Sequence, residues 1–128
     1  MSNKIKLVRI AKLRAHEKVC PQRLAEVMNL INQRGEIVNP IIIDKKTKVV
    51  LDGHHRVECL KRLGCSLVPA MEVDYFSDQV RVFLRREELI KEIVLSRALK
   101  KRLLPDKTTR HLIKNRIRGV KIRLDKLR

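Results

Sequence analysis

Residues 41–56 read IIIDKKTKVVLDGHHR, and this stretch carries the clearest structural pattern in the chain. Two short aliphatic runs, 41–43 and 49–51, are separated by the turn-forming residues 44–47, so we expect a β-hairpin. A helix should begin directly after Gly53, because apolar residues recur at helical spacing between Val57 and Leu63. The stretch therefore predicts a hairpin that leads through a glycine into a helix.

The sequence on either side predicts further strands and helices. Strands are expected at 5–10, 67–75 and 120–124, and helices between Pro21 and Gly35 and at 86–103. Pro69 should lie near the start of its strand or on a sheet edge, and Pro105 should end the second of these helices. Together the elements predict one mixed α/β domain of the α+β type over residues 1–128, with a small mixed sheet and packed helices.

The composition favours a folded protein of the cytoplasm. Hydrophobic residues make up 44% of the chain, yet the longest apolar runs span three residues, far below the ~20 that cross a bilayer. The first ten residues contain no apolar segment typical of a signal peptide. The three cysteines are odd in number and form no CxxC motif, which is typical of reduced thiols in a cytosolic protein. We therefore expect a cytoplasmic protein without a membrane partner.

The charge is strongly positive and unevenly distributed. The chain carries a net charge of +17, and residues 100–128 hold twelve Lys and Arg residues against two Asp residues. A basic C-terminal third of this kind suits a nucleic-acid partner, a nucleotide or an acidic surface. A solubilising basic face explains the same charge equally well. Nucleic acid is therefore one of two open interpretations of residues 100–128.

The turn Asp52-Gly53-His54-His55-Arg56 is the strongest candidate for a reactive centre. The chain has only four glycines, and they form neither a P-loop nor a GxGxxG motif. A helix that begins at this turn exposes unpaired N–H groups and the positive end of its dipole, which suits a phosphate. Both histidines and the arginine add donors at the same place. A metal site that uses His55 and Cys59 is weaker, because no second ligand pair has zinc spacing and Cys59 fits the core.

Two other polar segments are candidates for function. His16-Glu17 falls between the first strand and the first helix, where a carboxylate can reach into a cleft, although composition alone indicates an ordinary solvated glutamate. The segment Lys107-Thr108-Thr109-Arg110-His111 groups two hydroxyls, two cations and a histidine. Capping of a helix by threonine and binding of phosphate or a small polar substrate explain this segment equally well.

Three features together resemble the ParB/sulfiredoxin superfamily: Asn39-Pro40-Ile41, the hairpin, and the glycine-polar-polar-arginine turn that opens a helix. Within that superfamily the sequence is most similar to the free-serine kinases of archaea and bacteria. The matching segments follow the family order over nearly the whole chain, and they are His16-Glu17, residues 50–56, Val73-Asp74-Tyr75, Pro105 and residues 107–111.

The resemblance implies a kinase that transfers a phosphoryl group from ADP or ATP to the hydroxyl of free L-serine. The product would be O-phospho-L-serine, which some organisms use for cysteine synthesis, and Mg²⁺ would be the cofactor. Glu17 would act as the base and Asp52 as a second catalytic residue. The donor phosphates would be held by Gly53, His54, His55 and Arg56, and the serine by Lys107, Thr108, Thr109, Arg110 and His111.

Two rival functions remain open from the residues. A ParB-like protein would place residues 100–128 on DNA, and the aromatic content of only 2% argues against a base-stacking platform for single strands but not against duplex contacts. A nucleotide phosphatase or nuclease would use the same turn with water in place of serine. The metal ligands and the choice between ADP and ATP are not defined by the sequence.

Overall fold

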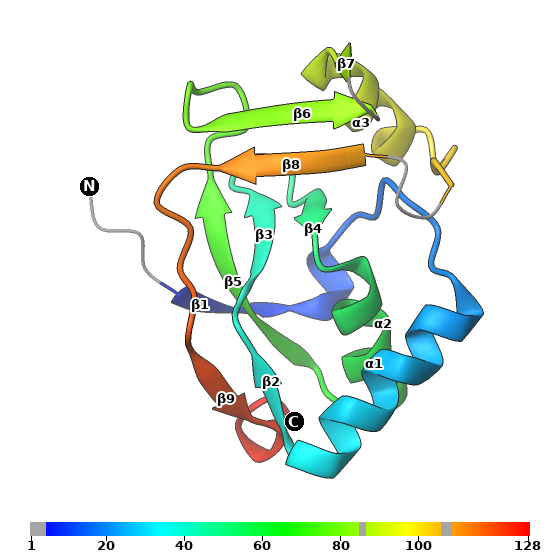
Figure 1. The fold of residues 1–128 in the computed structure, drawn as a ribbon, viewed down its shortest axis with the longest axis vertical. Helices are drawn as coiled ribbons and strands as arrows, with labels where there is room; N and C mark the ends of the chain where they lie inside the picture. The colour runs from blue at the N-terminus through cyan, green and yellow to red at the C-terminus, as the bar shows by residue number, and fades with distance from the viewer. Residues whose placement is uncertain (1–4, 85–86, 106–108) are drawn as a thin grey trace.

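The computed structural model describes residues 5–84, 87–105 and 109–128. Its helices are α1 (Pro21–Arg34), α2 (His54–Arg62) and α3 (Lys91–Leu99). Its strands are β1 (Ile5–Arg9), β2 (Glu36–Val38), β3 (Ile41–Asp44), β4 (Val50–Asp52), β5 (Leu67–Val73), β6 (Val80–Leu84), β7 (Glu87–Glu88), β8 (Thr109–Ile113) and β9 (Lys121–Arg123). Figure 1 shows β6, β8 and α3 on one side of the central strands, and α1 and α2 on the other. The predicted α+β class is confirmed.

The central sheet has four strands in the order β1-β5-β3-β4. The predicted hairpin is confirmed as the antiparallel pair β3 and β4, and β3 also pairs parallel with β5. All four residues of β3 are buried, because helices cover one face of the sheet and β6 with α3 covers the other. A strand buried on both faces needs a continuous aliphatic run, which is what residues 41–43 provide.

Pro69 lies near the start of β5, which confirms the first of its two predicted places, and not on a sheet edge, because β5 is an inner strand between β1 and β3. Pro69 stands opposite Leu7 of β1, whereas the pairing of β5 with β3 begins one residue later, at Ala70. Proline can therefore occupy this position, since only one neighbouring strand runs beside it there.

The predicted helix at 86–103 is too long. In the structure Glu87 and Glu88 form β7, which pairs with β6, and Ile90 has the extended conformation of an N-cap residue. The helix begins at Lys91 and ends at Leu99, before Pro105 is reached. Residues 87–88 pair with β6 instead, and the helical spacing of apolar side chains begins only after them, at Leu89.

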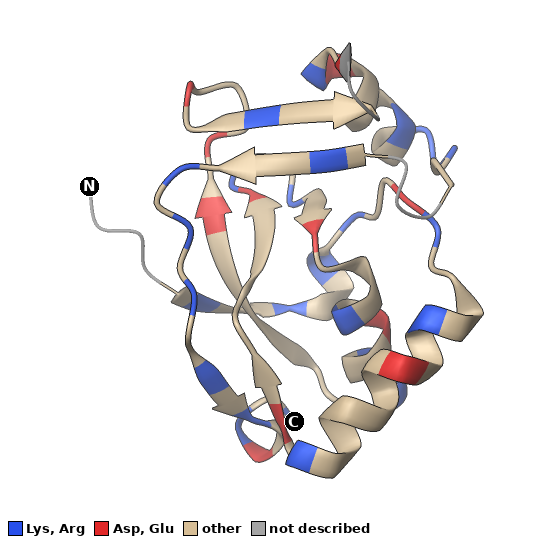
Figure 2. Ribbon diagram, viewed as in Figure 1, with Lys and Arg blue, Asp and Glu red and all other residues tan. Residues whose placement is uncertain are grey.

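In the described residues after Pro105, the chain forms two strands, β8 and β9, and a short 3-10 helix at Leu124–Lys126. Thr109 begins β8, which pairs antiparallel with β6, so helix capping by Thr109, one of the two interpretations that the sequence left open for this segment, is ruled out. Lys107 and Thr108 lie outside the described residues. The predicted closing strand is confirmed over Lys121–Arg123, which pairs with β2 at the end of α1. In Figure 2 the chain from β8 to β9 carries Lys and Arg at intervals along its length.

Two clusters of buried side chains hold these layers together. One packs α1 and α2 against the sheet and contains Cys59, which confirms the prediction that this cysteine is a core residue. The other packs the opposite face of the sheet against β6 and α3, around Tyr75. All three cysteines carry free thiols. Among the described residues, none of the helices is long and apolar enough to cross a membrane.

Candidate functional site

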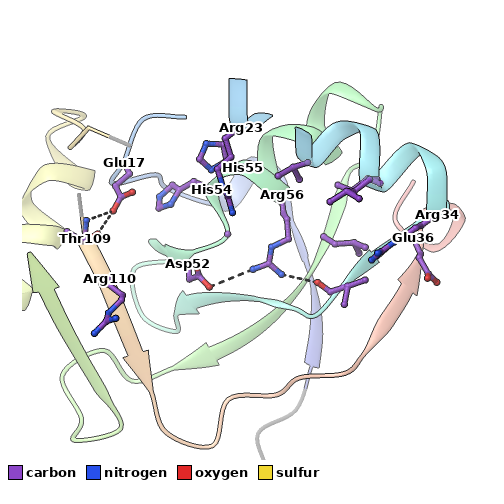
Figure 3. A pocket seen from close by; sticks show the side chains of 16 residues that line it. Glu17, Arg23, Arg34, Glu36, Asp52, His54, His55, Arg56, Thr109 and Arg110 are labelled. Atoms are coloured by element: carbon purple, nitrogen blue, oxygen red, sulfur yellow. Dashed lines mark hydrogen bonds and ion pairs between the residues drawn. The ribbon is translucent and has the colours of Figure 1, made fainter. Parts of the chain in front are cut away.

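A cavity of about 630 Å³ opens at the junction of β4 and α2. Its lining comes from α1, β2, the β4–α2 turn, Glu17 and the first residues of β8, segments that are far apart in the sequence. In Figure 3 Glu17 and Thr109 lie at one end of the view, Arg34 and Glu36 at the other, and Asp52, His54 and Arg56 between them. The volume lies within the range of small-molecule and cofactor sites.

Gly53 lets β4 turn directly into α2 at the edge of this cavity. Its φ of +112° is in the region that favours glycine, and a Cβ placed there would lie 2.4 Å from Cγ2 of Ile41. Helix α2 begins at His54 without a side-chain cap. The predicted start of a helix directly after Gly53 is therefore confirmed, and a helix N-terminus without a side-chain cap suits an anion.

The two histidines of the turn are held by main-chain donors. Nε2 of His54 accepts a hydrogen bond from the N–H of His16 at 3.2 Å, and Nε2 of His55 accepts one from the N–H of Cys20 at 3.0 Å. Burial and the neighbouring His16 lower the pKa of His54 to about 3. His54 is therefore neutral, with its hydrogen on Nδ1.

Arg56 makes structural hydrogen bonds that the sequence does not indicate. Its Nη1 donates to the carbonyl oxygens of Val38, Asn39 and Pro40 at 3.2, 2.8 and 3.3 Å, and Nη2 lies 3.8 Å from Asp52. Burial lowers the pKa of the guanidinium, although Asp52 opposes that change. Arg56 lines the cavity, but its main contacts tie the 38–40 backbone to α2.

Glu17 is buried, so the expectation of an ordinary solvated glutamate is wrong. Its Oε2 accepts a hydrogen bond from the Thr109 N–H at 3.0 Å and a short one from the Thr109 hydroxyl. Burial alone raises the pKa of this carboxyl, but hydrogen bonds from His16 and Thr109 outweigh burial and hold the pKa at about 2. Glu17 therefore presents an ionised carboxylate at the wall of the cavity at neutral pH.

His16 stands behind Glu17 and is fully buried. Its Nδ1 lies 2.7 Å from the Val50 carbonyl oxygen, and its Nε2 lies 2.8 Å from the Thr109 hydroxyl and 3.3 Å from Oε2 of Glu17. Its ring packs edge-on against the rings of His54 and His111, with centroids 4.7 and 5.5 Å away. His16 thus joins the three segments that the sequence singled out.

Asp52 also lines the cavity and is paired with a residue that sequence reasoning missed. Arg116, from the segment between β8 and β9, donates a short hydrogen bond to its Oδ2. Burial raises the pKa of Asp52, but the bond and charge of Arg116 outweigh burial and hold that pKa below its usual range. Asp52 is therefore an ionised carboxylate bound by a cation, which limits its strength as a proton acceptor.

The described part of the 107–111 segment is divided between the cavity and the core. Thr109 and Arg110 line the cavity, whereas His111 is buried and is not part of its lining. Nε2 of His111 lies 2.9 Å from the Tyr75 hydroxyl, and burial lowers its pKa to about 3. His111 is therefore a neutral residue behind the cavity wall.

The part of the cavity formed by α1 and β2 was not predicted. It combines an apolar surface with the cations Arg23 and Arg34, and its apolar members are Val27, Leu30, Ile31, Ile37 and Val38. One signal was present in the sequence, because Arg23 falls in the first turn of α1, where the helix dipole disfavours a cation. Leu30, an exposed leucine of α1, was a second signal.

The described residues contain no cluster of three or more His, Cys, Asp or Glu side chains suited to hold a metal ion. Such a cluster is not required for Mg²⁺ in a nucleotide site, where one or two carboxylates share the ion with substrate phosphates. Glu17 and Asp52 are two carboxylates on one cavity, so the residues present fit a magnesium ion that arrives with a nucleotide.

Known proteins resemble this chain in sequence and in fold. An ATP-dependent L-serine kinase of Staphylothermus marinus is 40% identical over 82 residues, which are 59% of this chain and 32% of that protein. A ParB-like protein of Sulfolobus acidocaldarius is 38% identical over 89 residues, or 64% of this chain and 41% of that protein. The matched segments thus span less than half of either relative. No protein-family model matches the chain.

The fold comparison extends over the whole chain. The structure of a free serine kinase in complex with AMP superimposes with a TM-score of 0.89 at 15% identity, covering 100% of this chain and 95% of that one. This likeness covers the whole chain, whereas the sequence match to the Staphylothermus marinus protein covers 59% of it. The chain therefore has the ParB/sulfiredoxin-like fold, and its resemblance to the free-serine kinases is confirmed.

Proposed function

We propose that this chain transfers a phosphoryl group from ADP or ATP to the hydroxyl of free L-serine, giving O-phospho-L-serine. The observation that carries the proposal is the ionised Glu17 carboxylate on a cavity that also exposes the N-terminus of α2. The names of the Staphylothermus marinus relative and of the AMP-bound structure support the same reaction class.

The two ends of the cavity suit the two parts of an adenine nucleotide. Apolar side chains of α1 and β2 offer a surface for the base, and the first N–H groups of α2 offer hydrogen bonds to phosphate oxygens. Arg23, Arg34 and Arg110 add positive charge. Phosphoryl transfer depends mainly on positioning and on neutralising charge, which this lining supplies.

Glu17 would accept the proton of the serine hydroxyl. An ionised carboxylate can do this only as the oxygen attacks phosphorus and becomes more acidic, so the base acts during transfer rather than before it. The fixed hydrogen bonds to Thr109 hold one carboxylate oxygen in place. Glu17 or Asp52 would hold Mg²⁺, which would supply positive charge beside the donor phosphates.

The test is an assay with Mg²⁺, ADP or ATP, and a panel of free amino acids. We expect O-phospho-L-serine as the product, with homoserine a poorer acceptor because its extra methylene displaces the hydroxyl from in-line geometry. Release of phosphate without phosphoserine would instead identify a nucleotide phosphatase, and the absence of turnover with either donor would refute the kinase.

A matched pair of variants assigns the base. Glu17→Gln keeps the shape of the side chain but removes the carboxylate, and we expect kcat to fall by about 10²–10⁴-fold with little change in nucleotide affinity. Glu36→Gln is the control, because Glu36 lines the same cavity at the opposite end of the view in Figure 3. Equal losses in the two variants would remove Glu17 from the mechanism.

A further inference from the structure

A second cavity, of about 300 Å³, lies where β6 begins and β8 ends. It is bounded by the loop before β6 and by the chain that leaves β8, and it shares no lining residue with the first cavity. In Figure 2 Lys and Arg lie on β6 and along the chain that leaves β8. Cations outnumber carboxylates four to one in the lining; the cations are Arg81, Lys114, Arg116 and Arg118, and the carboxylate is Asp78.

Two of these cations have no counter-charge within the protein. Arg81 is paired with Glu88, whose carboxylate accepts hydrogen bonds from its Nε at 3.2 Å and its Nη2 at 3.0 Å. Among the described residues, neither Lys114 nor Arg118 has a carboxylate within ion-pair distance. Both side chains are exposed, so each can turn toward a ligand. Unpaired cations that converge on one concave wall favour an anionic ligand.

Two buried polar atoms of the same wall lack a hydrogen-bond partner. Among the described residues, the buried side-chain nitrogens and oxygens without a partner are Nδ1 of His111 and Nε of Arg116, and both residues line the second cavity. His111 is only 8% exposed, and its Nε2 already contacts the Tyr75 hydroxyl. Native proteins seldom leave buried polar atoms unpaired, and an ordered water or a bound ion is a common partner. The wall therefore has unused hydrogen-bonding capacity as well as unused charge.

Arg116 stands between the two cavities. It lines the second, whereas its Nη2 donates to Asp52, which lines the first. Asp52 also lies 3.8 Å from Nη2 of Arg56, so two guanidinium groups share this carboxylate. Within the described residues Arg116 makes no hydrogen bond besides the one to Asp52. Its other N–H groups therefore remain for an oxyanion.

We propose that the second cavity binds the phosphate group of a small molecule, either inorganic phosphate or a phosphate monoester, between Lys114, Arg116 and Arg118. Such a group carries a charge of about −1.5 to −2 near pH 7 and has three acceptor oxygens, which suits three converging cations. Each phosphodiester of a nucleic acid carries a single charge, and a small concave cavity suits a small ligand better than a continuous backbone. Asp78 opposes the binding, but the three cations outweigh it. The proposal does not depend on the kinase reaction.

The first test locates phosphate on the intact protein by NMR. Inorganic phosphate is titrated at constant ionic strength set with sodium chloride, glycerol 3-phosphate is titrated in a second series, and the backbone amides are followed. We expect saturable shifts at residues 79 and 111–118, and the ligand that saturates at the lower concentration identifies the free ion or the monoester as the preferred form. Shifts confined to residues 53–56 would place phosphate at the start of α2 alone and would overturn the proposal. This result is the same whether or not the chain phosphorylates serine.

The second test uses matched double variants. Lys114→Met/Arg118→Met removes the two unpaired cations, whereas Lys121→Met/Arg128→Met removes an exposed lysine and arginine of the same C-terminal third that line neither cavity. Loss of charge-assisted hydrogen bonds should raise the Kd for phosphate at residues 111–118 by at least about tenfold in the first variant and by less than about twofold in the second. Equal weakening in both would indicate general attraction to a basic protein and would refute a built site. Loss of duplex DNA binding in the first variant with an unchanged phosphate Kd would assign these cations to a nucleic-acid surface instead.

Discussion

Replacing Gly53 by alanine tests the close approach that shapes the candidate site. A Cβ at this position would lie 2.4 Å from Cγ2 of Ile41, 2.8 Å from its Cβ and 3.1 Å from Nη2 of Arg56. Ile41 is fully buried and cannot move without disturbing β3. Gly64, with φ of +79° and nothing within 4 Å of an added methyl group, provides the matched control, because alanine there meets backbone strain but no clash.

The expected magnitude follows from these two terms. Alanine in a left-handed conformation costs about 1–2 kcal/mol, and this cost applies at both glycines. Overpacking against a buried side chain adds about 1–3 kcal/mol at Gly53 alone. The stiffening of the unfolded chain by alanine is common to both variants and cancels in the comparison. For a chain of 128 residues, 1 kcal/mol corresponds to about 4 °C in Tm, so Gly53→Ala should melt about 4–12 °C below Gly64→Ala.

Thermal or urea denaturation measures this difference, and nucleotide affinity is measured at a temperature where both variants are folded. We expect weaker nucleotide binding in Gly53→Ala only, because relief of the clash moves the start of α2. Equal melting temperatures for the two variants would refute the close contact between Gly53 and Ile41. Equal nucleotide affinities in the two variants would show that the phosphates do not bind at the Gly53 turn.

Three further predictions concern charge. Arg56→Met should lower the free energy of unfolding by about 1.5–3 kcal/mol in a denaturation assay, because it removes the donor to the carbonyl oxygens of residues 38–40. Arg23→Met should leave stability unchanged and weaken nucleotide binding, as measured by calorimetry. The free energy of unfolding should fall as pH drops below 6.5, because His54 and His111 have pKa values of about 3 in the fold and bind protons only when the chain unfolds. Each histidine lowers the free energy of unfolding by at most about 1.4 kcal/mol per pH unit. An unchanged urea midpoint between pH 6.5 and 4.5 would contradict this. Duplex DNA should bind residues 100–128 at low salt, without sequence preference and with affinity that falls steeply as salt rises, and a specific complex that survives about 0.2 M salt would favour the ParB-like alternative.

Local features of the sequence predicted the parts of the fold that depend on neighbours along the chain. The hairpin and the turn at Gly53 follow from aliphatic runs and glycine within one short stretch, and α1 ends at Gly35 in the left-handed conformation that a terminal glycine favours. The α3 boundary failed because the pairing of Glu87 and Glu88 with β6 is a tertiary contact that helical spacing does not reveal.

The candidate site was only partly predictable for a related reason. Glu17 and Thr109 are separated by 92 positions, and their contact depends on β8 pairing with β6 rather than on any pattern near either residue. Composition therefore assigned Glu17 to solvent, and it left helix capping and binding equally open for Thr109. The apolar part of the cavity comes from α1 and β2, whose side chains look like ordinary core residues until the fold leaves them at its edge.

The buried polar residues identify the site independently of any resemblance. Among the described residues, the polar or charged side chains that are buried are His16, Glu17, Asp44 and His111. Asp44 has a structural explanation, because it accepts hydrogen bonds from Thr47 and from the Tyr75 N–H and so fixes the β3–β4 turn. The other three lie together at the cavity, with Glu17 in its wall and His16 and His111 behind that wall, where burial of each polar group costs free energy unless it is paired. His16 and His111 are thus buried near the Glu17 carboxylate, in a core that is otherwise mostly apolar. Such an exception to the packing rules is expected at a functional site.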